Sequence, residues 1–231
     1  MDVLVEGVQR AFGLLLGADP EILAVLRLSL QVSGTATLIA LLLGIPTGAA
    51  LALARFPGRT LLVSAVNTGM GLPPVVVGLF VTILLWRSGP FGDWEVLYTP
   101  AAIVLAQAVI ASPIVTGITL AAVQNVPAKF RLQLVALGAS RAQMVWVVLR
   151  EARLPMLAAV MAGFGGVISE IGASMMVGGN IKGQTRTLTT AMVLETGKGS
   201  FDVAIALSIL LLALVFAVNW LLTTIQQRRA L

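Results

Sequence analysis

A polar run follows the fourth long apolar stretch of the sequence and contains residue types that bind anions. It combines hydroxyl, amide, ammonium and guanidinium groups directly after a Gly-Gly pair. Such donors can hold a tetrahedral dianion, because a guanidinium fork matches two oxygens of the anion. The run is equally consistent with a solvated outer loop that includes a short re-entrant helix and docks a partner protein. The candidate residues for either role are Asn180, Lys182, Thr185, Arg186 and Thr187.

A second candidate is Glu170, an acidic residue inside the fourth apolar stretch. Small residues recur every four positions around it, and such stripes permit close contact between helices. A charged carboxylate at mid-membrane depth costs about 2.5–3.5 kcal/mol on insertion scales, so Glu170 should be paired or lie beside an aqueous cavity. It is therefore either a structural hydrogen-bond acceptor or part of a transport pathway, although its charge would repel an anionic substrate.

Prolines interrupt the second apolar stretch at Pro73 and Pro74. Each proline removes a backbone donor, which is tolerable inside a membrane only where protein or water satisfies the freed carbonyl. The interruption can line a pathway or serve packing alone, and the sequence leaves both open. Together with the acidic residue and its neighbours, the candidate pathway or gate residues are Pro73, Pro74, Ser169, Glu170, Gly172 and Ser174.

The elements that position these residues are predicted to be membrane-spanning helices. The chain is 58% hydrophobic and only 11% charged, which exceeds the apolar share of ordinary soluble domains. Because a helix needs about 20 apolar residues to cross a bilayer, five segments qualify as spans. A shorter N-terminal segment, 3–16, contains acidic and basic residues and favours a helix lying on the membrane over a sixth span. The predicted spans are about 29–54, 61–86, 100–123, 154–177 and 203–225.

The charge distribution predicts the orientation, because cytoplasmic loops are rich in Lys and Arg. With the N-terminus outside and the C-terminus in the cytoplasm, Glu151 is the only acidic residue of the inner segments, whereas acidic residues outnumber basic ones outside. Residues 1–231 are expected to form a single transmembrane domain. The positive charge is divided among short loops, which argues against a nucleic-acid partner.

A basic segment at about 127–153 is then placed in the cytoplasm. It is predicted to contain two helices, of which Pro127 opens the first and Gly138 ends it in a left-handed conformation. Ser140 and Gln143 form a capping box that starts the second. An apolar side of the first helix is predicted to contact a soluble partner, the alternative being an ordinary amphipathic loop. That side holds Phe130, Leu134 and Leu137.

This segment resembles the coupling segment of ABC-importer permeases. The resemblance lies in Ala136-Leu137-Gly138-Ala139-Ser140-Arg141, followed by a helix and Pro155. The sequence departs from the family at 132–134, where Leu-Gln-Leu replaces the usual Glu-Ala-Ala, and at Glu151, where proline is frequent. The glycine joint and the basic flank are retained, so the resemblance assigns ATPase coupling to 136–141.

Other stretches resemble the oxyanion permeases within that group. These are 71–79, with the Ser-Gly-Pro-Phe-Gly turn that follows it, and 168–173. The stretch 175–191 most resembles the tungstate-specific branch, and molybdate permeases share its Thr-Arg-Thr-Leu core. The resemblance implies import of a tetrahedral oxyanion, foremost tungstate, by alternating access driven by a separate ATPase. Molybdate, sulfate and methionine-type importers are the alternatives, and Thr185-Arg186-Thr187 favours oxyanions.

The implied fold is all-α, of the type I ABC-importer permease class, with five transmembrane helices, an N-terminal interfacial helix and a cytoplasmic coupling helix. The implied location is the prokaryotic cytoplasmic (inner) membrane, in contact with lipid. The implied partners are a second copy of this chain, two cytoplasmic ABC ATPase subunits and an extracytoplasmic oxyanion-binding protein.

The chain itself is not predicted to be an enzyme. It contains no Cys and no His, so it has no thiolate nucleophile, no imidazole base and no zinc site of the usual kind. It has no G-x-x-x-x-G-K-[ST] phosphate loop, so ATP and Mg²⁺ are expected on the partner ATPase and neither a metal nor a cofactor on this chain. An ATP-independent channel or carrier, or a membrane scaffold, remains an alternative class that ATP-dependent flux would distinguish.

Overall fold

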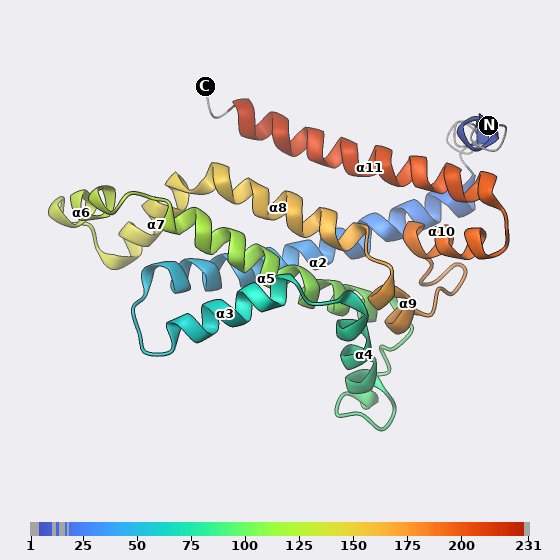
Figure 1. The fold of residues 1–231 in the computed structure, drawn as a ribbon, viewed down its shortest axis with the longest axis horizontal. Helices are drawn as coiled ribbons and strands as arrows, with labels where there is room; N and C mark the ends of the chain where they lie inside the picture. The colour runs from blue at the N-terminus through green and yellow to red at the C-terminus, as the bar shows by residue number, and fades with distance from the viewer. Residues whose placement is uncertain (1–4, 11–12, 14–16, 18, 229–231) are drawn as a thin grey trace.

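The computed structural model describes residues 5–10, 13, 17 and 19–228. These residues form an elongated bundle of α-helices, with one 3₁₀ turn at Gly92–Trp94 and no β-strand among them. The helices α2 (Pro20–Leu53), α5 (Pro100–Gln124) and α8 (Arg153–Ile168) run side by side, and α11 (Phe201–Arg228) lies along α8 (Figure 1). The predicted all-α class is thereby confirmed.

Small residues hold α2 and α5 together at the centre of the bundle. A Cβ atom added at Gly44 would lie 2.8 Å from a methyl group of Val115, and one at Gly48 would lie 2.6 Å from the carbonyl oxygen of Thr116. The backbones therefore approach one another more closely than larger residues would permit. Asp19 caps the start of α2 by accepting a hydrogen bond from the Glu21 N–H, so the helix begins before the predicted span.

The second predicted span, 61–86, is not one straight helix. It consists of α3 (Arg59–Met70) and α4 (Pro74–Leu85), which meet at an angle of 102°. The reason is the Gly71-Leu72-Pro73-Pro74 sequence, because Pro74 lacks the N–H needed to continue α3 and has the φ angle of a first helical residue. As a result, α4 projects from the side of the bundle (Figure 1).

The fourth predicted span, 154–177, is also broken. α8 and α9 (Gly172–Gly178) are bent by 58° around Ser169–Ile171, and a short helix, α10 (Leu188–Gly197), then packs on α11. Three of the described helices are long and apolar enough to cross a membrane, and up to five spans result if each bent pair is counted once. The predicted number of spans agrees with that upper figure.

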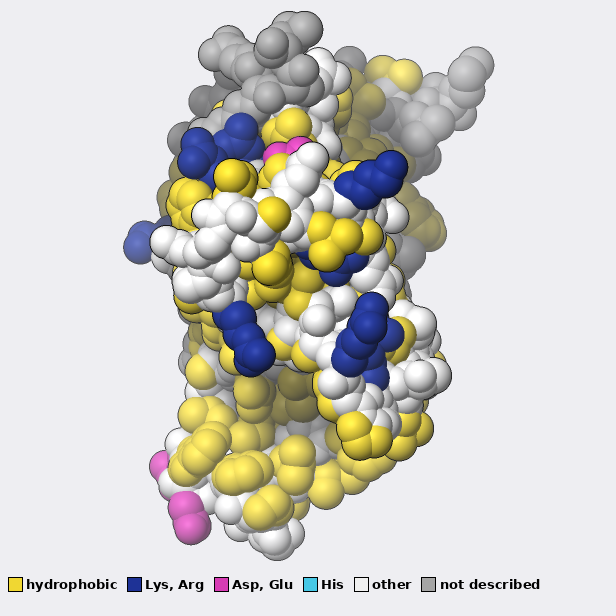
Figure 2. All heavy atoms as spheres, turned by 90° about the vertical axis from the view of Figure 1, so that its left-hand side faces the viewer, with side chains coloured by type: hydrophobic (Ala, Val, Ile, Leu, Met, Phe, Trp, Pro, Cys, Tyr) yellow, Lys and Arg dark blue, Asp and Glu magenta, His cyan; other side chains and the backbone are white. Residues whose placement is uncertain are grey.

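The ends of the bundle differ in charge. α6 (Ala128–Ala136) and α7 (Arg141–Glu151) lie at one end, here called the basic end, where most of the charged side chains in view are Lys and Arg (Figure 2). α9 and α10 lie toward the opposite end. Residues 5–10 of the predicted surface helix are helical there, whereas 3–4, 11–12 and 14–16 lie outside the described residues.

Candidate functional site

The predicted coupling segment, 136–141, folds as an elbow between α6 and α7. Gly138 has a φ angle of +79°, its N–H donates to the Val135 carbonyl, and the Ala139 N–H donates to the Leu134 carbonyl. These two bonds form a Schellman motif, which requires a left-handed residue and thus favours glycine. The structure therefore agrees with the predicted glycine joint.

A capping box starts α7, as the sequence predicts. The Ser140 hydroxyl accepts from the Gln143 N–H at 3.3 Å, and the Gln143 side chain accepts from the Ser140 N–H at 2.8 Å. Both ends of the elbow are thus fixed by local hydrogen bonds, so 136–141 can move as one unit with the helices that flank it.

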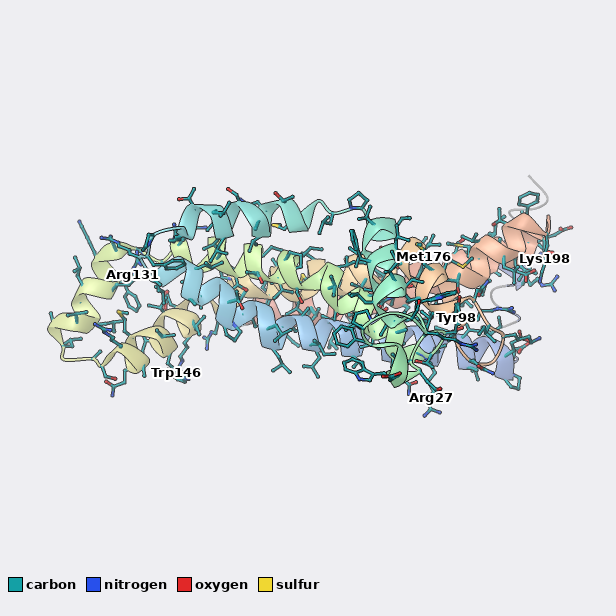
Figure 3. The ribbon with its side chains drawn as sticks, turned by 90° about the horizontal axis from the view of Figure 1, so that it is seen from below. Arg27, Tyr98, Arg131, Trp146, Met176 and Lys198 are labelled. Carbon is teal, nitrogen blue, oxygen red and sulfur yellow. The ribbon has the colours of Figure 1, made fainter. Side chains whose placement is uncertain are left out.

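The predicted contact face of α6 is only partly correct. Phe130 and Leu134 pack inward, against buried residues of α5 and α7. In contrast, Leu137 is 84% exposed. The prediction treated α6 as an isolated helix, whereas α7 and the end of α5 already cover one of its sides. The exposed apolar residues of the elbow region are Leu132, Val135, Leu137 and Trp146, with Arg150 stacked over the last (Trp146 is labelled in Figure 3).

Glu170 lies at the break between α8 and α9 and is buried. Its carboxylate accepts hydrogen bonds from the Ala173 N–H at 2.7 Å, the Ser174 N–H at 3.0 Å and the Ser174 hydroxyl at 2.9 Å. These donors are in the first turn of α9, where N–H groups have no partner inside the helix. The carboxylate therefore has the contacts of a structural acceptor.

Side chains from two other helices also form hydrogen bonds at the break between α8 and α9. Gln107 of α5 donates its amide to the carbonyl of Val167 at 3.0 Å and to the Ser174 hydroxyl at 3.3 Å. The Thr189 hydroxyl of α10 donates to the backbone carbonyl of Glu170 at 3.1 Å. Polar groups that the bend removes from the helical hydrogen-bond ladder are thus satisfied within the protein, as membrane depth requires.

The two bent spans contact each other where they bend. A Cβ atom on Gly172 would lie 2.6 Å from a methyl group of Val75, and one on Gly78 would lie 2.7 Å from the Cα atom of Ala173. α4 therefore packs directly on α9, with Met176 beside it (Figure 3). Of the predicted pathway residues, Glu170 and Ser174 are buried, whereas Ser169 is exposed and donates its hydroxyl to the Gly165 carbonyl.

The Gly78→Ala substitution should separate α4 from α9. The added methyl group would meet backbone, which cannot rotate away, so we expect a loss of roughly 1–3 kcal/mol in the free energy of unfolding. Thermal unfolding of the purified protein in detergent measures this. Gly34→Ala in α2 is the matched control, because a Cβ there meets nothing within 4 Å. Equal behaviour of the two variants would contradict the close packing.

Three of the five predicted outer residues are engaged inside the protein. The buried Thr185 hydroxyl donates to the Gly178 carbonyl and accepts from the Ile181 N–H. Thr187 caps α10 by accepting from the Thr190 N–H. The Asn180 amide donates to the Thr190 carbonyl at 3.2 Å. These groups shape the loop between α9 and α10, and they have few free donors for an anion.

The two cations of the loop share one carboxylate at the start of α2. Lys182 lies 2.7 Å from Glu21, and Arg186 lies 3.8 Å from the other oxygen of the same carboxylate. The side chain of Arg186 is only 17% exposed. The pair of cations thus carries one positive charge more than its partner neutralises. Cavities of about 440 and 530 Å³ adjoin Arg186, and their charged lining also includes Arg10, Arg27, Glu195 and Lys198 (Figure 3 labels Arg27 and Lys198).

A comparison with known families decides the class of the protein. Residues 35–231 match the family described as binding-protein-dependent transport system inner membrane component. The chain belongs to this family. Members are ABC-transporter permeases, multi-pass proteins of the inner membrane, whose ATPase is a separate chain.

Curated permeases with related sequences extend along most of the chain. A probable anion ABC transporter permease of Haloferax volcanii is 41% identical over 203 residues, covering 86% of this chain and 88% of its own. The tungstate uptake system permease TupB of Peptoclostridium acidaminophilum is 37% identical over 227 residues, covering 98% of this chain and 100% of its own. The molybdenum transport permease ModB of Escherichia coli K12 is 31% identical, covering 91% of this chain and 97% of its own.

Solved permeases share the fold at lower sequence identity. An inward-facing structure of the MetNI methionine ABC transporter superposes with a TM-score of 0.72 at 20% identity, covering 91% of this chain and 98% of the other. A bacterial ABC transporter involved in alginate import superposes with a TM-score of 0.73 at 15% identity, covering 90% of this chain and 79% of the other. These matches confirm the predicted permease fold.

Two contacts of the permease were missed by sequence reasoning. Gln107 is a polar residue within an apolar span, which is itself a signal of a functional or structural role in a membrane. The pairing of Glu21 with the α9–α10 loop joins residues more than 150 positions apart in the chain, and no local pattern indicates it.

Proposed function

We propose that this permease imports a tetrahedral oxyanion and that tungstate is its preferred substrate. The observation that carries this is the 37% identity to a tungstate permease over 227 residues, which includes every candidate site. The anion permease of Haloferax volcanii supports the broader class. Molybdate is the second candidate, because ModB matches over nearly the same length.

The proposed assembly contains two copies of this chain, two ATPase subunits and an extracytoplasmic binding protein. The basic end then faces the cytoplasm, since Lys and Arg gather there, and the N-terminus lies outside. The elbow at Gly138 contacts the ATPase through its exposed Leu137. ATP and Mg²⁺ bind to the ATPase subunits, whose closure moves the elbow.

The bends of the second and fourth spans form the proposed gate region. Pro73 and Pro74 permit the α3–α4 bend, and Gly172 allows α9 to pack against it. Glu170 and Ser174 hold the α8–α9 bend in shape by hydrogen bonds. A movement of α8 is therefore transmitted to α4 through direct backbone contact.

Uptake by reconstituted vesicles tests the substrate. The full transporter, with its ATPase and binding protein, is supplied with ATP and equal concentrations of tungstate, molybdate or sulfate, and the imported metal or sulfur is measured by elemental analysis. We expect selective tungstate uptake that disappears with an inactive ATPase variant. Uptake of none of the three by a complex with active ATPase would overturn the oxyanion assignment.

Arg186→Ala should lower uptake if this residue contacts the anion or its binding protein at the outer end. Loss of a charge-assisted hydrogen bond worth about 1.5–3 kcal/mol reduces uptake at low substrate roughly tenfold or more. Glu21→Gln is the control, because it removes the ion pair while Arg186 is retained. Unchanged uptake in Arg186→Ala, or the same loss in both variants, would remove the assignment.

A further inference from the structure

A cavity of about 280 Å³ lies at the basic end, where α2 ends and α3 begins. The end of α5 and the first turns of α6 close it. Its polar lining consists of three arginines and one glutamine, and its remaining lining is the last turn of α2. These polar residues are Arg55, Arg59, Gln124 and Arg131.

Within the described part of the chain, the three guanidinium groups form no ion pair with a carboxylate. None of the residues that line the cavity is acidic, and the ion pairs found among the described residues are at the opposite end. Arg59 is held in place, because its Nε–H donates to the Leu51 carbonyl at 2.6 Å. The Nε of Arg131 is buried and has no hydrogen-bond partner within the described part of the chain. A buried guanidinium donor without a partner is costly, so this arrangement calls for an anion.

We propose that Arg55, Arg59 and Arg131 bind a phosphate-like anion, that is, a tetrahedral group with negatively charged oxygens. Guanidinium forks match the oxygens of such a group two at a time, and Gln124 adds an amide donor. The residues come from the α2–α3 turn, α5 and α6, so the bound group would bridge α6 to the transmembrane helices (Figure 3 labels Arg131).

The bound group has two possible sources. The site lies at the ends of membrane-spanning helices on the basic side, which is the level at which the headgroups of anionic phospholipids meet basic pockets. A free tetrahedral anion in solution presents the same oxygens. In both cases the site is distinct from the charged loop between α9 and α10, which lies toward the other end of the bundle.

Binding to the full-length permease in nanodiscs tests the proposal. Native mass spectrometry measures phosphatidylglycerol retained from discs of phosphatidylcholine and phosphatidylglycerol, and thermal unfolding in neutral detergent measures stabilisation by inorganic phosphate at constant ionic strength. The test variant is Arg55→Gln/Arg59→Gln/Arg131→Gln. The matched control is Lys129→Gln/Arg150→Gln/Arg153→Gln, which removes the same charge from exposed positions at the same end.

The wild type and the control variant should bind the phosphate-bearing probe at least about tenfold more tightly than the test variant. The test variant is weaker because it loses at least one charge-assisted hydrogen bond. Retention of phosphatidylglycerol without an effect of phosphate identifies a lipid headgroup, and saturable stabilisation by phosphate identifies a free oxyanion. No binding of either probe, or an equal loss in both triple variants, would overturn the proposal. If the triple test variant does not fold, the single variant Arg131→Lys is measured instead. This variant keeps the positive charge but loses the guanidinium fork, so it should bind the probe several-fold more weakly than the wild type.

Discussion

Replacing Gly138 with valine is expected to uncouple ATP hydrolysis from transport. Gly138 has a φ angle of +79°, and a left-handed conformation costs an ordinary residue about 1–2 kcal/mol and a β-branched residue more. No neighbouring atom lies within 4 Å of a Cβ at this position, so the substitution strains only the backbone of the elbow. The elbow should therefore change shape rather than unfold the bundle. Uptake per ATP hydrolysed in reconstituted vesicles should fall at least fivefold.

Two controls separate elbow geometry from general strain. Gly138→Asn should preserve coupling, because asparagine adopts left-handed conformations more readily than other residues. Gly199→Val imposes the same type of strain at a φ angle of +78°, also in open space, but between α10 and α11, and it should leave coupling unchanged. Normal coupled uptake by Gly138→Val would refute the role of the left-handed joint.

The Glu170→Leu substitution should destabilise the protein strongly. It removes the acceptor of three hydrogen bonds and leaves the N–H groups of Ala173 and Ser174 buried without partners. At about 1–3 kcal/mol for each unsatisfied donor, we expect a loss of several kcal/mol in the free energy of unfolding. Thermal unfolding in detergent should show a markedly lower midpoint, and uptake should fall with the amount of folded protein.

Glu170→Gln should be tolerated much better. Its carbonyl oxygen can still accept from the Ala173 N–H, and its amide can donate to the Ser174 hydroxyl, which is able to accept as well as donate. Only one of the three contacts then lacks a partner. An equal loss of stability and uptake in both variants would instead indicate that the negative charge itself is required.

Local features of the fold were predictable because they depend on neighbours in the sequence. Gly138, Ser140 and Gln143 determine the elbow through short-range hydrogen bonds, and apolar length indicates the spans. The sharp bends were not predicted, although Pro73 and Pro74 marked the place of one. A bend of 102° rather than a mild kink depends on the contact of α4 with α9, which is distant in sequence.

The candidate site was predictable in composition but not in arrangement. Lys182 and Arg186 are anion-binding residue types, yet their shared partner is Glu21, at the other end of the chain. Thr185 and Thr187 also suit an anion by type, but the loop uses their hydroxyls to hold its own backbone. Residue type alone does not show whether a hydroxyl is free, because that depends on the folded backbone around it.

The hydrogen bonds at the break after α8 also impose an order on biosynthesis. Residues 154–177 are apolar enough to enter the bilayer as one helix, and Gln107, which supports the bend, has been synthesised by then. Thr189 follows Glu170 by 19 residues and is therefore synthesised only after the whole fourth span. The final shape of this span is therefore completed only after translation has passed α10, when the nascent chain is already in the membrane.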